Sequence, residues 1–191
     1  MEAYVINLKK RHDRLVSFKQ NKFPFPVEVF EGFVNKVPED GCTQSHLYLL
    51  RNHIQLPFAV FEDDCVLIQD WSLVEKAMWQ LPKDWDALWL GANPRKQLVQ
   101  YSENLYRIKN AYCLHGVIYN SQRIVDYIYN KVNFRSGENL DIHIAKDVQH
   151  KFNCYSIWPM VATQLSDHSD ISNIGTKNCE EIIFNYKKAT R

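Results

Sequence analysis

Three acidic side chains, Glu62, Asp63 and Asp64, stand in a row directly after an apolar run at residues 56–61. Such a run is typical of a short strand buried on both faces of a parallel sheet. Because side chains alternate along a strand, we expect Glu62 and Asp64 on one side and Asp63 on the other. Two carboxylates on one side repel each other unless a cation lies between them, and oxygen ligands suit Mn²⁺ or Mg²⁺. The triplet therefore predicts a divalent metal site at Glu62 and Asp64. The alternative is that these acids cap a helix or face water.

Two side chains far along the chain could add to this site. His168 lies in a polar loop after an expected strand at residues 154–159, and imidazole is a suitable third ligand for a manganese-like ion. Asp141 opens an expected helix within residues 139–152 and, at about 100° per residue, falls in the middle of its apolar face. Burying a carboxylate without compensation is unfavourable, so Asp141 is expected to line a cleft, where it could act as a general base. The alternative for Asp141 is a charge stabilised by the helix dipole.

Basic and polar side chains near the amino terminus could hold an anionic ligand. A strand expected at residues 3–8 ends in a basic turn that contains Arg11 and Arg14, and both could pair with a diphosphate. Ligands of open α/β sheets bind beyond the carboxyl ends of the strands, which is where this turn lies. A helix expected to open with Thr43 as its cap places Ser45 and His46 in its first turn, where donors meet anions or sugars. The alternative for each is a solvated or structural role.

The bulk properties indicate one compact α/β domain. The 191 residues are 46% hydrophobic, which is enough for a core, and the net charge of +1 gives no reason to expect nucleic acid. No apolar run approaches the roughly 20 residues that span a bilayer, and the amino terminus is too polar for a signal peptide. Five dispersed cysteines without a CxxC pair favour free thiols, and hence a cytoplasmic location. We expect the domain to cover residues 1–175 and a charged tail to cover residues 176–191.

In this order along the chain, these segments resemble glycosyltransferase family 25, which contains bacterial lipopolysaccharide sugar transferases and collagen galactosyltransferases. The resemblance covers about residues 3–172. The matching pieces are Val5-Ile6-Asn7-Leu8 with Arg11 and Asp13-Arg14, Gly41-Cys42 with Ser45-His46-Leu47, Phe61-Glu62-Asp63-Asp64, Asp86-Ala87-Leu88-Trp89-Leu90-Gly91, Gly116-Val117-Ile118-Tyr119, Leu140-Asp141, and Gln164 with Ser169-Asp170-Ile171.

The resemblance implies a GT-A-like fold, that is, a Rossmann-related, mostly parallel sheet flanked by helices. Glu62 stands where the acidic metal motif of the family more often has aspartate, and Asp64 and His168 would complete the metal site. The family pattern also implies a set of donor contacts. These are Asn7, Leu8, Arg11, Arg14, Ser45, His46 and Gly116.

The implied reaction is transfer of a hexose, with inversion, from UDP-galactose or UDP-glucose to a hydroxyl of a glycan, a lipid-linked sugar or a protein side chain. The metal and the arginines would neutralise the departing diphosphate. Asp141, or as second choice Asp63, would take the proton of the acceptor hydroxyl. A catalytically inactive sugar-nucleotide or glycan-binding domain is the alternative, suggested by the replacement at Glu62. A nucleotidyltransferase or sugar pyrophosphorylase is disfavoured, because the turn at residues 9–14 contains no glycine-rich phosphate loop.

Overall fold

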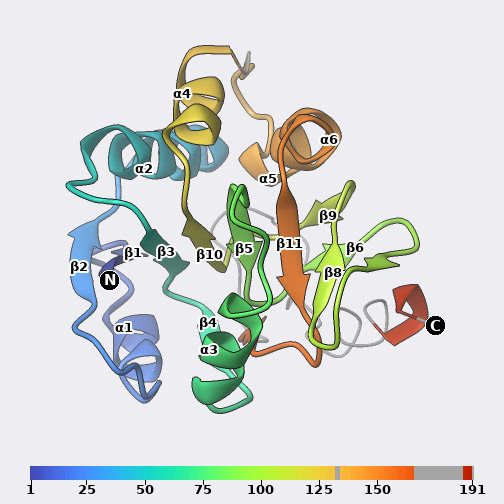
Figure 1. The fold of residues 1–191 in the computed structure, drawn as a ribbon. Coiled ribbons are helices and arrows are strands. Elements are labelled where there is room, and N and C mark those ends of the chain that lie inside the picture. The colour runs from blue at the N-terminus through green and yellow to red at the C-terminus, as the bar shows by residue number, and fades with distance from the viewer. Residues whose placement is uncertain (132–133, 166–186, 191) are drawn as a thin grey trace.

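A mixed eight-stranded sheet organises the part of the chain that the computed structural model describes, residues 1–131, 134–165 and 187–190 (Figure 1). Its strand order is β2-β1-β3-β10-β5-β11-β8-β7, and two small two-stranded sheets join β12 to β4 and β6 to β9. The elements are β1 (Glu2–Asn7), α1 (His12–Phe18), β2 (Glu28–Glu31), α2 (Pro38–Asn52), β3 (Phe58–Glu62), β4 (Cys65–Leu67), α3 (Ser72–Met78), β5 (Ala87–Trp89), β6 (Asn93–Pro94), β7 (Val99–Gln100), β8 (Leu105–Arg107), β9 (Ala111–Tyr112), β10 (Gly116–Tyr119), α4 (Gln122–Lys131), α5 (Leu140–His143), the π-helical turn η1 (Ile144–Val148), α6 (Gln149–Lys151), β11 (Cys154–Ile157) and β12 (Ala162–Gln164).

Most strands of the large sheet run in one direction. β1 pairs in parallel with β2 and β3, and β5 pairs in parallel with β11. β10 runs antiparallel between β3 and β5, and β8 runs antiparallel to both β11 and β7. Within the described residues only β10 and β8 therefore oppose the common direction. The expected α/β fold with a mostly parallel sheet flanked by helices is confirmed.

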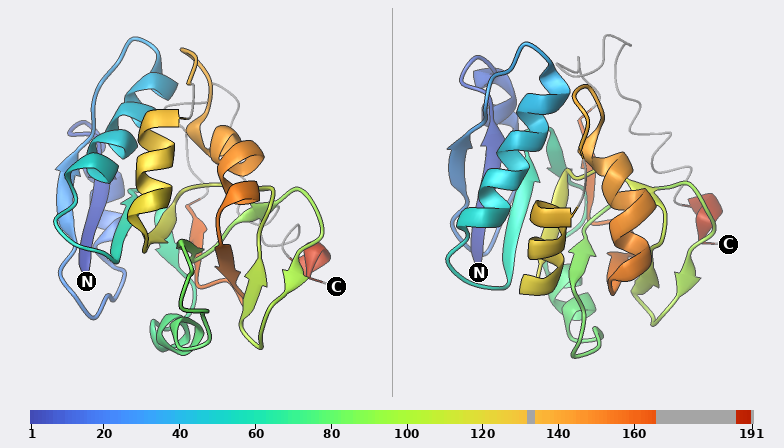
Figure 2. Two further views of the ribbon diagram at one scale, coloured as in Figure 1. Left: turned by 45° about the horizontal axis from the view of Figure 1, so that its top comes forward. Right: turned by 90° about the horizontal axis from the view of Figure 1, so that it is seen from above.

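The two faces of the sheet are covered by different helices. In Figures 1 and 2, α2, α4 and the α5–η1–α6 segment lie over one face, and α1 and α3 lie over the other. Strand β3 shows how the sequence builds both cores, because successive side chains point to opposite faces. Its Phe58 and Val60 join the core that contains Leu50 of α2, whereas Phe61 joins the core that contains Phe18 of α1. All these side chains are buried, so the expectation of a strand covered on both faces is confirmed.

Helix α2 begins earlier than the sequence suggested. It starts at Pro38, with Glu39 and Asp40 in its first turn, and Val37 as its N-cap residue. Proline suits the first helical position and acids suit the positive end of the helix dipole, so this start is favoured over one at Thr43. The expectation that Ser45 and His46 occupy the first turn was wrong, because they lie in the middle of the helix. They therefore act through their side chains and not through unpaired amides of a helix terminus.

Candidate functional site

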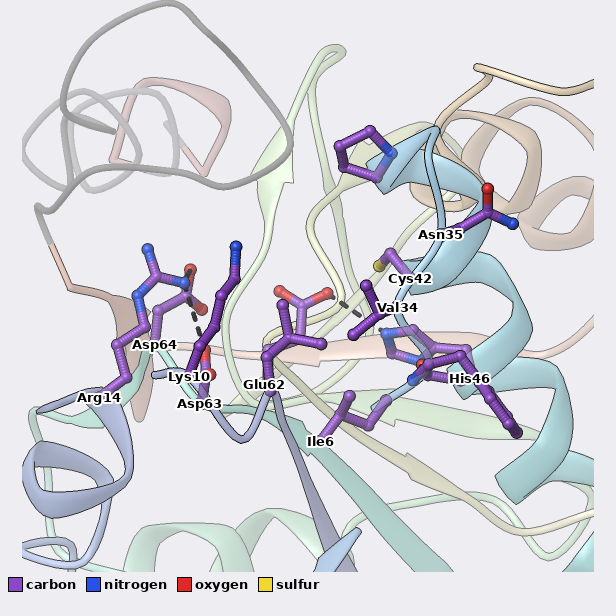
Figure 3. A pocket seen from close by; sticks show the side chains of 14 residues that line it. Ile6, Lys10, Arg14, Val34, Asn35, Cys42, His46, Glu62, Asp63 and Asp64 are labelled. Carbon is purple, nitrogen blue, oxygen red and sulfur yellow. Dashed lines mark hydrogen bonds and ion pairs between the residues drawn. The ribbon is translucent and has the colours of Figure 1, made fainter. Parts of the chain in front are cut away.

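A cavity of about 140 Å³ lies where the parallel strands β2, β1 and β3 end. The segments that follow these strands line it on one side, and the inner face of α2 lines it on the other (Figure 3). Its charged and ionisable lining includes Lys10, Arg14, His46, Glu62, Asp63 and Asp64. Ligands of α/β sheets bind beyond the carboxyl ends of strands, so this position is the one expected for a functional site.

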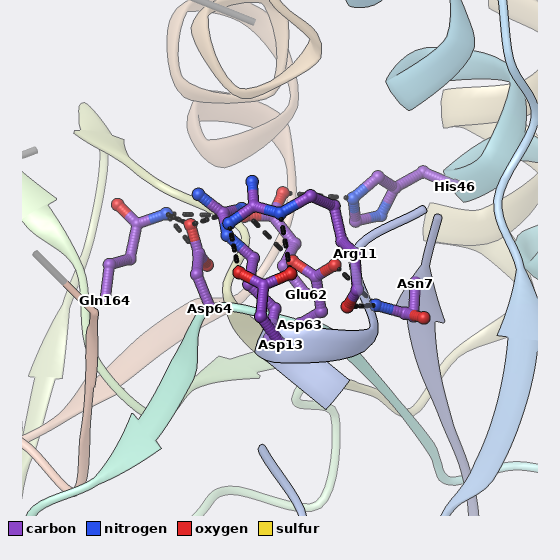
Figure 4. Close-up of polar contacts among 9 residues, drawn as sticks. Asn7, Arg11, Asp13, His46, Glu62, Asp63, Asp64 and Gln164 are labelled. Carbon is purple, nitrogen blue, oxygen red and sulfur yellow. Dashed lines mark hydrogen bonds and ion pairs between the residues drawn. The ribbon is translucent and has the colours of Figure 1, made fainter. Parts of the chain in front are cut away.

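Glu62 and Asp64 are brought together by a residue about 100 positions away. Strand β3 ends at Glu62, and Asp63 and Asp64 form the turn into β4. Because β12 pairs antiparallel with β4, Gln164 lies opposite Cys65. The Nε2 atom of Gln164 lies 3.3 Å from Oε2 of Glu62 and 3.4 Å from both carboxylate oxygens of Asp64 (Figure 4). The two acids thus face one shared donor. Asp63 lines the same cavity and shares Arg14 with Asp64, because Asp63 and Asp64 lie in a turn, where the alternation expected along a strand does not apply.

This acid pair fits a divalent cation of the Mn²⁺ or Mg²⁺ type. The amide group of Gln164 presents the positive end of its dipole to both carboxylates, which is the position that a shared cation would take. Carboxylate and amide oxygens are the ligands that these hard cations prefer. His168, the third predicted ligand, lies outside the described residues, as does the expected domain boundary at residues 175 and 176.

Asp63 holds the segment that follows β1. Its Oδ2 accepts a hydrogen bond of 2.8 Å from Nδ2 of Asn7, and its Oδ1 lies 3.2 Å from Nη1 of Arg14. The same Arg14 nitrogen lies 3.8 Å from Asp64, so one buried guanidinium serves two carboxylates. Asn7 also donates to the carbonyl oxygen of Arg11, which fixes the turn after β1. Asp63 is therefore placed to hold Arg14 toward the cavity.

Burial raises the pKa of Asp63 to about 6. The hydrogen bond from Asn7 and the charge of Arg14 lower this pKa, the charge of Asp64 raises it, and burial outweighs the lowering contributions. The native state therefore holds the Asp63 proton to a higher pH than the unfolded chain, whose reference pKa is 3.8.

We expect this difference to appear as a pH dependence of stability. The stability that Asp63 contributes is fully present below pH 3.8 and is lost as the pH rises through about 6. Asp63→Asn should remove this fall in the free energy of unfolding between pH 4 and pH 6, measured by urea denaturation at several pH values. The matched control is Asp70→Asn, an exposed carboxylate in a turn, which should keep the fall. Parallel curves for wild type and Asp63→Asn would contradict the raised pKa.

On the α2 side of the cavity, His46 and Ser45 have different roles. The Nε2 atom of His46 lies 3.3 Å from Oε1 of Glu62, and His46 is only 1% exposed. The hydroxyl of Ser45 donates to the carbonyl oxygen of Gly41 at 2.7 Å and accepts from the backbone N–H of Phe33 at 2.9 Å. Ser45 thus joins the segment after β2 to α2, whereas His46 presents a ring nitrogen to a cavity carboxylate.

The predicted donor and catalytic residues do not all meet at this cavity. The predicted residues that line the cavity are Leu8, Arg14, Ser45, His46 and Asp63. Asn7 does not line it but donates a hydrogen bond to Asp63. Arg11 makes an ion pair of 2.9 Å with the exposed Asp13. Two residues lie elsewhere. Gly116, a predicted donor contact, faces the core, because a side chain added there would meet Leu90, Phe61 and Cys65. Asp141, the predicted base, accepts a hydrogen bond of 3.0 Å from the backbone N–H of Cys113.

Sequence reasoning assigned no site role to three residues that the structure places here. Lys10 lines the cavity, and its position beside Arg11 in the basic turn was the available signal. Cys42 also lines it, and its spacing of four residues from His46 marks the same helix face. Gln164 entered only through the family resemblance, because no local pattern relates it to Glu62 and Asp64.

The comparisons with known proteins show a shared fold but identify no family. No protein-family model matches this chain, and no curated protein matches it. Among solved structures, A197 from STIV is similar with a TM-score of 0.55 and 12% identity over 87% of each chain. UTP-bound UGPase from Acinetobacter baumannii is similar with a TM-score of 0.44 and 12% identity, covering 95% of this chain and 65% of that one. At these values the first likeness shows a shared fold alone, and the second is too weak to argue from. Among the described residues, no helix combines the length and the apolar character needed to cross a bilayer.

Proposed function

We propose that this protein is a glycosyltransferase that uses a sugar nucleotide and a divalent metal, of the type that the resemblance to family 25 implies. One observation supports this most strongly. The cavity at the carboxyl ends of three parallel strands places the acid pair Glu62 and Asp64 next to the basic residues Lys10 and Arg14. A metal between the acids and a basic wall beside them are what a departing nucleoside diphosphate requires.

The dimensions of the cavity favour the diphosphate over the whole donor as its occupant. Its volume of about 140 Å³ is below the roughly 300–1,000 Å³ of pockets that enclose drug-sized ligands. A diphosphate with its cation fits such a space, and the sugar and the nucleoside would extend beyond it. Lys10 and Arg14 would then pair with phosphate oxygens, and Arg14 can do so in a fixed orientation because Asp63 holds it.

When bound, Mn²⁺ or Mg²⁺ would neutralise charge that develops on the diphosphate as the sugar is transferred. Glu62 and Asp64 would hold this ion in the place that the amide N–H group of Gln164 takes in this structure. The proposed donor is UDP-galactose or UDP-glucose. The proposed acceptor is a hydroxyl of a glycan, a lipid-linked sugar or a protein side chain, and the transfer is inverting.

An inverting transfer needs a general base, and neither of the two proposed bases is well placed in the cavity for this role. Both carboxylate oxygens of Asp63 are engaged, one by Asn7 and one by Arg14, so its geometry favours a positioning role. Asp141 is not among the residues that line the cavity, and it orients the backbone of Cys113. These placements favour, as a second candidate function, a catalytically inactive domain that binds sugar nucleotides or glycans.

A donor hydrolysis screen separates these functions. UDP-hexoses and GDP-hexoses are incubated with the protein, with Mn²⁺, with Mg²⁺ and with a chelator, and released nucleotide is measured. We expect slow, metal-dependent hydrolysis of one UDP-hexose. Metal-dependent binding of UDP by calorimetry without hydrolysis of any donor would favour the binding domain. If the protein shows no hydrolysis of any donor and no metal-dependent binding of UDP, both functions are refuted.

A further inference from the structure

Three side chains of different chemistry converge on the α2 side of the cavity. Cys42 and His46 are four residues apart in α2, so they lie one turn apart on the same face of the helix. Glu62 approaches them from the end of β3 (Figure 3). The sulfur of Cys42, a ring nitrogen of His46 and a carboxylate oxygen of Glu62 all lie within 4.8 Å of one another.

The separation of the His46 and Glu62 atoms matches that of two ligands of a tetrahedral zinc ion. With Zn–N and Zn–O bonds of roughly 2.0–2.1 Å, two tetrahedral ligand atoms lie about 3.3 Å apart. Nε2 of His46 and Oε1 of Glu62 are separated by 3.3 Å, which is longer than the usual hydrogen bond of about 2.9–3.0 Å. A Zn–S bond of about 2.3 Å requires the sulfur about 3.6 Å from each of these atoms, so the sulfur of Cys42, which lies within 4.8 Å of both, would move by about 1 Å to join the same ion.

One of the two neutral tautomers of His46 offers the lone pair of Nε2 to a cation. His46 is 1% exposed, and within the described part of the chain its Nδ1 atom has no hydrogen-bond partner. Either neutral tautomer therefore leaves one ring nitrogen poorly satisfied, which is unfavourable for a buried group. In the tautomer that is protonated at Nδ1, the lone pair of Nε2 faces the Glu62 carboxylate, and a cation at Nε2 would replace this repulsion with coordination by both groups. Nδ1 would still lack an acceptor, and such a missing partner typically weakens metal affinity about 10- to 100-fold.

We propose that Cys42, His46 and Glu62 form an exchangeable zinc site, with water in the fourth position. Thiolate and imidazole ligands select zinc, whereas the oxygen-only pair of Glu62 and Asp64 selects manganese or magnesium. On binding, the thiol of Cys42 releases its proton to solvent. Because both sites need Glu62, they exclude each other. Zinc would therefore inhibit the proposed transferase by withdrawing Glu62 from the donor site, and this inhibition alone depends on the proposed function.

Cobalt binding tests the site without any need for turnover. Co²⁺ substitutes for zinc, and a thiolate ligand gives an intense near-ultraviolet charge-transfer band. We expect this band in the wild-type protein, its loss in Cys42→Ser, and its retention in Cys113→Ser and Asp64→Asn. Cys113 is the matched control because it does not line the cavity. Absence of the band in the wild-type protein, or its retention in Cys42→Ser, would overturn the proposal.

A second measurement uses the unaltered chain, so that misfolding of a variant cannot obscure the result. Zn²⁺ should slow alkylation of Cys42 by iodoacetamide by about 10-fold or more, because the metal-bound thiolate is shielded. Mg²⁺, which avoids thiolate ligands, should not slow it. Peptide mass spectrometry reports Cys42 and Cys113 separately, and Cys113 should react equally with and without zinc. Equal labelling of Cys42 with and without Zn²⁺ would refute the site even if a sugar donor is hydrolysed.

Discussion

Replacement of Asp64 by asparagine should lower metal-dependent donor hydrolysis by about 10²- to 10³-fold. The shape of the side chain is kept, but one of the two carboxylates facing Gln164 loses its charge. A metal ion supplies several kcal/mol of charge stabilisation in such transfers, and each 1.36 kcal/mol corresponds to about tenfold in rate. Initial rates measured over a Mn²⁺ titration should show both a lower maximal rate and a weaker dependence on the metal.

Asp70→Asn is the matched control for this variant. Asp70 lies in an exposed turn, where its carboxylate accepts the backbone N–H of Ser72, and asparagine can make the same bond. Hydrolysis by Asp70→Asn should equal that of the wild-type protein. Thermal unfolding of Asp64→Asn should stay within a few degrees of wild type, since Asp63 still pairs with Arg14. Unchanged, metal-dependent hydrolysis in Asp64→Asn would contradict the role of the acid pair.

Gly91→Ala should destabilise the protein more than Gly116→Ala, although both changes add a single methyl group. A Cβ atom at Gly91 would lie 1.9 Å from the carbonyl oxygen of Ala162, a contact that no side-chain rotation can relieve. The backbones are held together there, because the carbonyl oxygen of Leu90 accepts hydrogen bonds from the amides of Val161 and Ala162. We expect a loss of about 3 kcal/mol or more, which for a chain of this size lowers the melting temperature by about 6–12 °C.

Gly116→Ala is the matched control, since the same methyl group meets its nearest neighbours at 3.5 Å, an ordinary contact distance. Its stability should stay within about 1 kcal/mol of wild type, because the added methyl group fills core space without a clash. Both variants are compared by thermal and urea denaturation. Gly91→Ala should also weaken metal-dependent hydrolysis, because displacing β12 moves Gln164 away from the two acids. A Gly91→Ala protein as stable as Gly116→Ala would show that the backbone contact relaxes freely.

The sequence alone determined the strand before the acidic triplet and the direction of its side chains. A strand with apolar side chains on both faces is expected to be buried on both, and the structure confirms this for Phe58 through Phe61. The sequence also predicted that Glu62 and Asp64 lie together, and both meet Gln164. It also predicted that Arg14, which follows β1, faces the site, and Arg14 lines the cavity from helix α1. These features depend on patterns a few residues long, which a sequence displays directly.

Only the tertiary structure decided which residues these acids meet. Gln164 reaches Glu62 and Asp64 because β12 pairs with β4. These strands are about 100 residues apart in the chain, and no local pattern specifies their pairing. Cys42 and His46 lie on one helix face toward Glu62 because α2 begins at Pro38, ahead of the expected cap at Thr43, so that Cys42 is part of the helix. Asp141 does not line the cavity that holds these acids, because its place in α5 brings it to the amide of Cys113. Burial and periodicity are local properties, whereas the partner of a polar side chain is set by long-range packing of the whole chain.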